Sequence, residues 1–161
     1  MARKKKVPST PALRMLGQAG VAYTVHQYDY VERGGTTASS SALGVDEHQV
    51  IKTLIFETDA RTPVIVCQHG DRSVSAKQLA RIIGCKSTRP CDPDVAQRHS
   101  GYRVGGTSPF GTRKTLPVYV EESILALEHI YINGGGRGLL VQLSPQVLID
   151  LLKAQSVRVS A

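Results

Sequence analysis

A lysine inside an apolar run is the first residue whose type and position could do chemistry. Lys52 interrupts the run Val50-Ile51-Lys52-Thr53-Leu54-Ile55-Phe56. A cation among apolar neighbours is costly unless it meets an anion or lines a pocket. The other interpretation is a half-buried strand from which Lys52 points to solvent. The pattern alone leaves both interpretations open.

Glycines around a proline form the second candidate. They occur in Gly101-Tyr102-Arg103-Val104-Gly105-Gly106-Thr107-Ser108-Pro109-Phe110-Gly111. Glycine lets the backbone approach a ligand closely, and amides exposed in such a turn can bind an oxyanion or a carbonyl oxygen. The segment lacks the order G-x-x-x-x-G-K-[ST] of a P-loop, which disfavours binding of a nucleoside triphosphate. The alternative is an ordinary glycine-rich loop.

The third candidate is the segment Asn133-Gly134-Gly135-Gly136-Arg137-Gly138, which follows a short apolar run. The glycines permit close approach of a ligand. Arg137 supplies a planar set of donors that suits a phosphate or a carboxylate. A mobile hairpin tip with an exposed arginine is an equally good interpretation of this pattern.

Motifs for nucleophilic or metal-dependent hydrolysis are not evident. The chain has no G-x-S-x-G elbow, no H-E-x-x-H motif and no recognisable Ser/His/Asp set. Cys67, Cys85 and Cys91 are odd in number and lack C-x-x-C spacing, which argues against a disulfide framework or a zinc motif. We therefore expect no metal and no cofactor, and a chemistry that depends on positioning and backbone donors.

The charge balance favours a polyanionic partner. Lysine and arginine outnumber aspartate and glutamate by 20 to 13, which gives a net charge of +7. Such a surface attracts nucleic acid, although the same charge can simply keep a protein soluble. No stretch reaches the roughly 18 apolar residues of a membrane helix, and no apolar run follows the basic N-terminus. We expect a cytoplasmic protein without a membrane partner.

The elements that must position these residues can be read from periodicity and end signals. The 161 residues predict one domain over 10–161, preceded by a basic, flexible tail over 1–9. Helices are expected at 11–17 or 11–20, 36–42, 75–83, 93–100 and 145–152, and strands at 21–30, 50–57, 63–68, 116–120, 129–133 and 139–143. The two adjacent runs 50–57 and 63–68 predict a hairpin. The fold class is α/β or α+β, with a mixed β-sheet flanked by helices.

Taken together, these segments resemble the YbaK/EbsC family of aminoacyl-tRNA deacylases, relatives of the editing domain of bacterial prolyl-tRNA synthetase. The resemblance extends from about Pro11 to Leu152. Its strongest parts are Val50-Ile51-Lys52-Thr53-Leu54, Val95-Ala96-Gln97-Arg98, Gly101 through Gly111, and Ile130-Tyr131 through Gly138. The resemblance implies a mixed sheet flanked by helices, without a metal or cofactor. It also implies trans-editing, the removal of cysteine from wrongly charged Cys-tRNA(Pro), with prolyl-tRNA synthetase as a possible partner.

The resemblance also assigns residues. The characteristic lysine of the family falls on Lys52, its G-x-x-x-P loop on the segment from Gly105 to Pro109, and a tyrosine of the pocket on Tyr28. We accordingly expect catalytic roles for Lys52, Gly105, Gly106, Ser108 and Pro109, and substrate-binding roles for Tyr28, Thr53, Thr107, Asn133, Gly134 and Arg137. The implied route is substrate-assisted: the cysteinyl thiol attacks its own ester carbonyl and cyclises, a path closed to prolyl esters.

Two positions depart from the family pattern and keep alternatives open. Asn133 stands where better-known members carry serine, and Leu140 stands where some carry an aspartate. The first alternative is a hydrolytic deacylase that removes alanine or another small residue with a positioned water. The second, of a different class, is a non-catalytic tRNA-binding module on the same scaffold.

Overall fold

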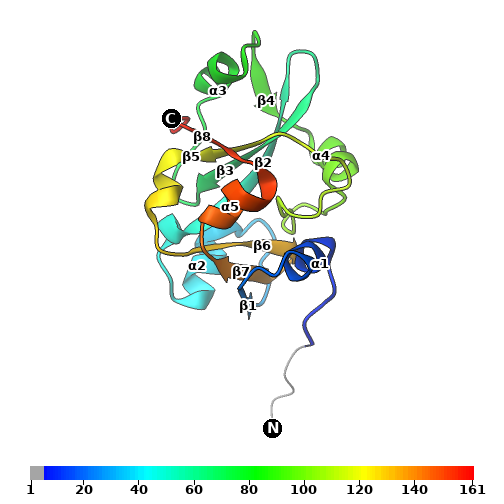
Figure 1. Cartoon of the computed structure of the whole chain (residues 1–161), viewed down its shortest axis with the longest axis vertical. Coiled ribbons are helices and arrows are strands. Elements are labelled where there is room, and N and C mark those ends of the chain that lie inside the picture. Colours follow the sequence, from blue (N-terminus) through cyan, green and yellow to red (C-terminus); the bar gives the residue numbers. More distant parts are fainter. Residues whose placement is uncertain (1–5) are drawn as a thin grey trace.

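The computed structural model describes residues 6–161 and places every strand in one mixed sheet (Figure 1). The strands are β1 (Thr24–Gln27), β2 (Val50–Thr58), β3 (Pro63–His69), β4 (Thr88–Pro90), β5 (Val118–Glu121), β6 (Ile130–Gly136), β7 (Leu139–Leu143) and β8 (Gln155–Val157). Their order is β1-β7-β6-β2-β3-β5-β8, and β4 pairs with the second half of β2. The β2–β3, β2–β4, β6–β7 and β1–β7 pairs are antiparallel, whereas β2–β6, β3–β5 and β5–β8 are parallel. The predicted mixed sheet is confirmed.

Five α-helices and two short 3₁₀ helices are found among the described residues. The α-helices are α1 (Pro11–Gln18), α2 (Gly35–Leu43), α3 (Ala76–Ile83), α4 (Pro93–Ser100) and α5 (Gln146–Leu152), and the 3₁₀ helices are η1 (Glu47–Gln49) and η2 (Glu122–Ala126). Thr10 caps α1 by accepting a hydrogen bond from the Leu13 amide at 3.1 Å. The glycines Gly44, Gly84 and Gly101 end their helices in the left-handed conformation. None of these helices is long and apolar enough to cross a membrane.

The alternation of β2 separates two faces of the sheet. Ile51 and Ile55 contribute to the larger core, which also contains α1 residues such as Leu16 and the α5 residue Leu148. Val50 points the other way and forms a small cluster with Tyr131 and Leu140. Leu43 and Val45 of the α2 end pack against that cluster, as does Tyr28. Helices therefore cover both faces, as expected, and the smaller cluster leaves room for polar groups beside it.

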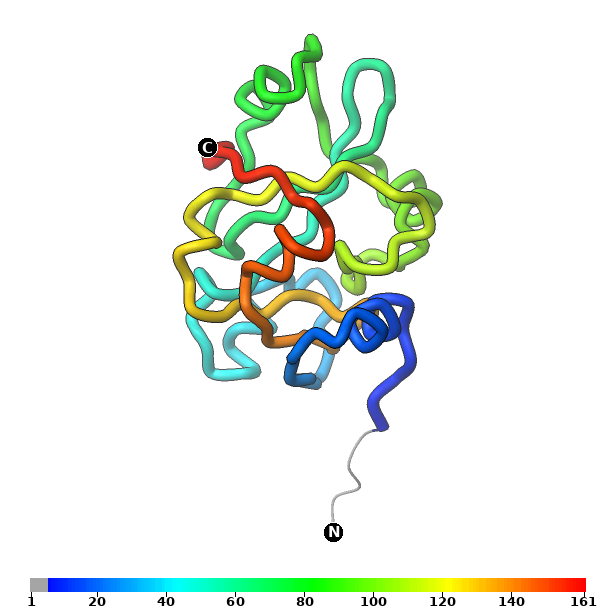
Figure 2. Tube along the Cα trace, in the orientation of Figure 1, coloured from blue at the N-terminus to red at the C-terminus, as the bar shows by residue number. Residues whose placement is uncertain are grey.

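The loop after α4 runs back toward α1. Figure 2 shows this yellow-green segment between α4 and the blue helix below it. The Gly111 amide there donates to the Met15 sulfur at 3.1 Å. A Cβ atom on Gly111 would lie 2.5 Å from the Pro11 carbonyl oxygen, so this close approach requires glycine. The candidate loop is therefore fixed at both ends, to α4 and to α1.

Some sequence predictions were wrong in extent or missed an element. The strand expected over 21–30 covers only Thr24–Gln27, because the pairing partner β7 is itself only five residues long. The strand expected over 116–120 lies at Val118–Glu121. The elements β4, β8 and η2 were not predicted. Residues 1–5 of the predicted tail lie outside the described residues, and 6–9 form no helix or strand.

Candidate functional site

The glycine-proline loop lies directly against the bulge that ends β6. Gly105 has φ +86° and contacts Tyr30, whose hydroxyl oxygen would overlap a Cβ atom at this position. A Cβ atom on Gly106 would lie 3.0 Å from the carbonyl carbon of Gly136 and 3.1 Å from the Arg137 nitrogen. Both positions therefore require glycine, one for its conformation and contact and the other for backbone-to-backbone packing.

Asn133 joins the two segments. Its side-chain nitrogen donates to the carbonyl oxygens of Gly105 at 3.2 Å and Gly136 at 3.1 Å. Its side-chain oxygen accepts from the amides of Gly135 at 2.6 Å and Gly136 at 3.1 Å. The side-chain amide of Asn133 thus makes four hydrogen bonds to the backbone, two as donor and two as acceptor. Asn133 shapes the β6 bulge and holds the loop against it.

Arg137 makes a second connection between the same segments. Its Nε donates to the Val104 carbonyl oxygen at 2.9 Å, and its guanidinium carbon lies 4.8 Å from the centre of the Tyr30 ring. A cation over an aromatic face at this distance is attracted by the ring. The exposed arginine is therefore bound to the loop in this structure, and a mobile hairpin tip does not describe it.

The inner end of the loop is buried. The Ser108 hydroxyl accepts from the Phe110 amide at 3.2 Å, and the Phe110 ring lies wholly inside the main core. The Tyr102 hydroxyl donates to the Phe110 carbonyl oxygen at 2.6 Å. The Gly106 amide donates to Arg103, whereas those of Thr107 and Ser108 donate to no partner within residues 6–161. The loop therefore keeps unused backbone donors while its side chains fix its shape.

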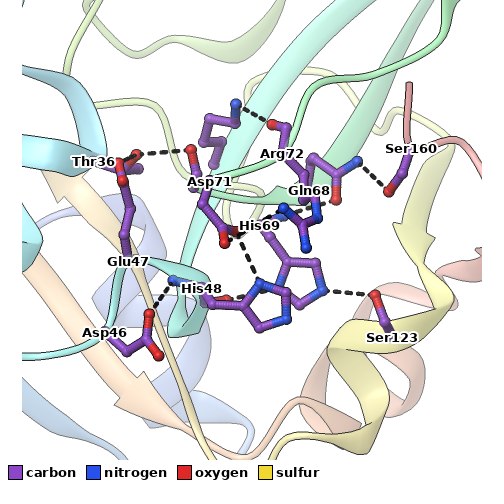
Figure 3. A network of polar contacts seen from close by, with 12 residues as sticks. Thr36, Asp46, Glu47, His48, Gln68, His69, Asp71, Arg72, Ser123 and Ser160 are labelled. Carbon is purple, nitrogen blue, oxygen red and sulfur yellow. Dashed lines mark hydrogen bonds and ion pairs between the residues drawn. The ribbon is translucent and has the colours of Figure 1, made fainter.

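Lys52 belongs to a polar network with Glu47, Asp71 and the loop at Arg72, three residues that are labelled in Figure 3. Its Nζ donates to the Arg72 carbonyl oxygen, in the loop between β3 and α3. Partial burial lowers the pKa of the Lys52 ammonium, and the nearby carboxylates of Glu47 and Asp71 act in the opposite direction. Glu47 is held by Thr36, whose hydroxyl donates to it at 2.8 Å. The amine is thus half-buried, with its charge balanced by two carboxylates.

Two stacked histidines support this network. The rings of His48 and His69 lie 3.7 Å apart and nearly parallel, at 6°. His48 Nδ1 donates to Asp71 at 2.8 Å, and His69 Nδ1 donates to the His48 carbonyl oxygen at 2.6 Å. His69 Nε2 is left to accept from the Ser123 hydroxyl, 2.7 Å away. Burial lowers the pKa of His69, so its neutral form is favoured.

The same network contains a group of potential metal ligands. Ligand atoms of His48, His69 and Asp71 lie within 4.8 Å of one another. Lone pairs of imidazoles lie in the ring planes, so two nearly parallel stacked rings do not aim at a common point. The ring nitrogens toward Asp71 and Ser123 are also engaged in hydrogen bonds. The hydrogen bonds of His48, His69 and Asp71 instead support the loop between β3 and α3, to which Lys52 donates.

Lys52 and Asn133 share one face of the sheet. The neighbouring residues Ile51 and Ile132 are the last paired positions of the parallel strands β2 and β6, and Lys52 and Asn133 each follow by one residue. Because side chains alternate along a strand, both point away from the main core, to the face of the sheet that α2 covers. Tyr28 lies on this face, and burial raises the pKa of its phenol while a hydrogen bond with Ser39 of α2 opposes that shift.

Two of the sequence-predicted residues point away from this face. Thr53 alternates with Lys52, and its hydroxyl is enclosed without a hydrogen-bond partner in the described chain. Gly134 accepts a hydrogen bond from the Thr10 hydroxyl at 2.6 Å on the α1 side. Among residues 6–161, no hydrogen bond links Lys52 to the glycine-proline loop. The site therefore has two parts, the Lys52 network and the loop with its bulge.

Comparison with known proteins places this arrangement in a family. A family model described as the aminoacyl-tRNA editing domain matches residues 34–151, which contain Lys52, the glycine-proline loop and the Asn133 bulge. The chain belongs to the aminoacyl-tRNA editing domain family. The YbaK/EbsC resemblance inferred from the sequence is thereby confirmed.

Relatives of this editing domain are known as separate proteins and as parts of ligases. EbsC of Enterococcus faecalis, named as a proposed Cys-tRNA(Pro)/Cys-tRNA(Cys) deacylase, is 28% identical over 161 residues, covering 99% of this chain and 98% of its own. A proline–tRNA ligase of Desulforamulus reducens is 26% identical over 137 residues, which cover 81% of this chain and 24% of the ligase. A crystal structure of a proposed trans-editing enzyme for prolyl-tRNA synthetase superposes with a TM-score of 0.82 at 21% identity, covering 96% and 99% of the chains, and supports the fold.

Several residues of this editing domain's site were not found by sequence reasoning. Tyr30 supports both Gly105 and Arg137, whereas the sequence predicted it only as the last residue of a strand. His48 and Asp71 hold the loop that receives Lys52. The buried Tyr102 braces the loop through Phe110. Their only sequence signal was polarity or an aromatic ring beside a glycine, which is too common to single them out.

Proposed function

We propose that this editing domain clears Cys-tRNA(Pro) in trans, through attack of the cysteinyl thiol on its own ester. Family membership supports aminoacyl-tRNA deacylase activity, and the choice of cysteine, of tRNA(Pro) and of mechanism is our proposal. The observation that carries it is the loop at Gly105–Pro109, held by Asn133 on the sheet face that also bears Lys52.

The unused amides of the loop are the proposed donors to the reacting carbonyl. The Thr107 amide is the best placed, because Thr107 is half-buried and its amide has no partner within residues 6–161. Donors fixed before the reaction stabilise the negative charge that develops on the carbonyl oxygen. Ser108 is fully buried and its hydroxyl accepts from the Phe110 amide, so it is proposed to act by holding the turn in place. Pro109 and the tight packing of Gly106 keep the turn rigid.

Lys52 is the proposed binder of the 3′ end of the tRNA. Its ammonium is half-buried and donates to a carbonyl oxygen that a substrate oxygen can replace. The terminal phosphate and the acyl carbonyl both offer such an oxygen. Tyr28 lies on the same face and is proposed to contact the terminal ribose or the amino acid. Arg137 and Asn133 complete the proposed wall beside the loop, whereas Gly134 faces α1.

The proposed reaction needs no nucleophile from the protein. The thiol sulfur forms a bond to the ester carbonyl carbon, and the oxyanion of the tetrahedral intermediate is stabilised by the loop amides. The bond to the ribose oxygen then breaks. The thiol proton is transferred to that oxygen, so the products are the cyclic thioester of cysteine and uncharged tRNA. Prolyl esters have no thiol and are spared.

The proposed partners follow from this substrate. Proline–tRNA ligases contain a segment similar to this chain, which supports tRNA(Pro) as the RNA and prolyl-tRNA synthetase as the source of the wrong product. The +7 net charge favours association with RNA. Because charged tRNAs are used in translation, we propose that this activity takes place in the cytoplasm.

The decisive experiment compares two charged tRNAs and two lysines. Release of cysteine from Cys-tRNA(Pro) and of alanine from Ala-tRNA(Pro) is measured with the wild type, with Lys52→Ala and with Lys77→Ala, an exposed lysine on α3. We expect release of cysteine alone, lost in Lys52→Ala and retained in Lys77→Ala. Release of alanine would replace our proposal with hydrolysis by a positioned water. Release of neither amino acid would leave a tRNA-binding module.

A further inference from the structure

A basic hollow lies beside α4, next to the start of the glycine-proline loop. Its volume is about 520 Å³, and it is lined by Asp94, Gln97, Arg98, Gly101 and Arg113. Arg98 and Arg113 are exposed, as is the following Lys114. Within residues 6–161, no carboxylate forms an ion pair with these three cations. Their charge is therefore available to a ligand.

Backbone contacts hold the two basic segments side by side. The Arg113 amide donates to the Ser100 carbonyl oxygen at 2.9 Å, and the Lys114 amide donates to that of His99 at 3.2 Å. A Cβ atom on Gly101 would lie 3.4 Å from the Arg113 Cβ, so the absence of a side chain there keeps the hollow open. The hollow is thus a built feature of the fold, formed where the end of α4 meets the returning chain.

The local potential is positive. Burial lowers the pKa of His99, and the charges of Lys114 and Arg98 lower it further. Lys114 Nζ lies 3.2 Å from His99 Nδ1, which fits donation from the ammonium to a neutral imidazole. The lining contains two guanidinium groups and one carboxylate, that of Asp94. Guanidinium groups present paired donors that match a phosphate.

The hollow and the proposed reaction site are joined by a short stretch of chain. Gly101 lines the hollow, and the next residue, Tyr102, donates to Phe110 at the far end of the loop. Gly105 is only four residues from Gly101, a span of at most about 14 Å for an extended chain. A tRNA with its charged 3′ terminus at the loop therefore has phosphates within reach of the hollow.

We infer that this hollow binds phosphates of the single-stranded 3′ end of the substrate tRNA, through Arg98 and Arg113. The inference rests on the proposed function, because it names the part of the same substrate that lies outside the reaction site. An acidic protein surface could also bind these arginines. The hollow lies next to the glycine-proline loop, however, and the 3′ end of the tRNA must reach that loop, which favours the RNA.

The test measures binding of uncharged tRNA(Pro) by fluorescence anisotropy at several salt concentrations. Replacement of both arginines, Arg98→Ala with Arg113→Ala, is expected to weaken binding at least about tenfold at low salt. The slope of log Kd against log salt should fall by about 1–2, since two phosphate contacts are lost. Arg81→Ala is the matched control: Arg81 is exposed in the last turn of α3, an eight-residue helix that also ends at a positive-φ glycine.

Two further arms identify the ligand. Arg98→Lys with Arg113→Lys keeps the charges and should preserve most of the salt slope. With tRNA(Pro) that lacks its single-stranded 3′ nucleotides, the wild type and the alanine double variant should bind equally. In kinetic assays the double variant should raise KM and leave kcat unchanged, because neither arginine touches the reacting ester.

Unchanged affinity and salt slope in the alanine double variant would overturn the inference, whether or not the protein deacylates tRNA. So would equal weakening by Arg81→Ala, or loss of binding to prolyl-tRNA synthetase with tRNA affinity intact. Weakened tRNA binding by a wild type that releases no amino acid would sustain the hollow as an RNA site. That result would contradict only the proposed reaction.

Discussion

Gly105 and Gly84 offer a matched pair for testing how the loop is held. Both glycines have φ +86°, so alanine is strained equally at either position. Nothing lies within 4 Å of a Cβ atom on Gly84, at the end of α3. At Gly105 the same atom would overlap the Tyr30 hydroxyl and lie 2.8 Å and 2.9 Å from two ring carbons. The two alanine variants therefore differ mainly in the contact with Tyr30.

The expected magnitudes follow from this difference. The left-handed conformation costs alanine about 1–2 kcal/mol, offset by about 0.4–1 kcal/mol from a less flexible unfolded chain. Gly84→Ala should therefore cost about 1 kcal/mol, or about 2–4 °C in Tm for a chain of this size. Gly105→Ala adds about 1–3 kcal/mol for overpacking and for displacement of Tyr30 from Arg137. Its Tm should fall by about 5–15 °C.

The activities should separate more clearly than the stabilities. Movement of Gly105 weakens its bond to Asn133 and shifts the loop amides, and misplacement by about 1 Å can cost about 100-fold in rate. We expect Gly105→Ala to lose at least about tenfold in kcat for deacylation and Gly84→Ala to keep the wild-type value. Combining Gly105→Ala with Tyr30→Ala should recover part of the Tm. Equal Tm values and kcat values for the two single variants would refute the proposed contact between the loop and Tyr30.

Three further changes test other parts of the molecule. Asn133→Asp places an anionic oxygen against two carbonyl oxygens. It should cost about 2–4 kcal/mol of stability, measured by urea denaturation, together with most of the activity. Wild-type stability of this variant would contradict the role of the Asn133 side-chain nitrogen. Thr53→Val removes an enclosed hydroxyl that has no partner and should stabilise the fold by about 1 kcal/mol with KM unchanged, whereas a raised KM would show that Thr53 binds substrate. His69 has a pKa below its ordinary value of 6.5, so the unfolded chain takes up the proton first and Tm should fall as pH drops below about 6.5. His69→Gln should flatten that part of the Tm profile, and an unchanged profile would exclude His69 as its cause.

Local chemistry was sufficient to predict many of the elements. Thr10 followed by Pro11 marks the start of α1, and Ser75 accepts from the Gln78 amide at the start of α3. Gly44 and Gly101 end their helices in the left-handed conformation, which glycine adopts readily. The predicted hairpin of β2 and β3 is confirmed by their antiparallel pairing. Each of these features is decided by residues a few positions apart, which a sequence displays directly.

The missed elements depend on partners that are distant in the chain. The three-residue strand β4 exists because it pairs with the end of β2, and β8 exists because it pairs with β5. Neither Thr88–Pro90 nor Gln155–Val157 has the alternation of a stable strand on its own. The contacts of the site have the same character, since Asn133 and Gly105 are separated by 28 residues and Arg137 and Val104 by 33. Residue types suggested these positions, and only the fold shows that they touch.

The two parts of the site are held by different structures and should fail in different ways. Lys52 depends on the loop between β3 and α3, which the pair of His48 and Asp71 supports. The glycine-proline loop depends on Asn133 and Tyr30, and hence on the β6 bulge. Loss of Lys52 removes a charged contact from an otherwise intact face, whereas loss of Asn133 loosens the loop and the bulge together. A reaction that needs the substrate's 3′ end and its ester carbonyl fixed at once requires both parts, because either alone leaves one end of the reacting group free to move.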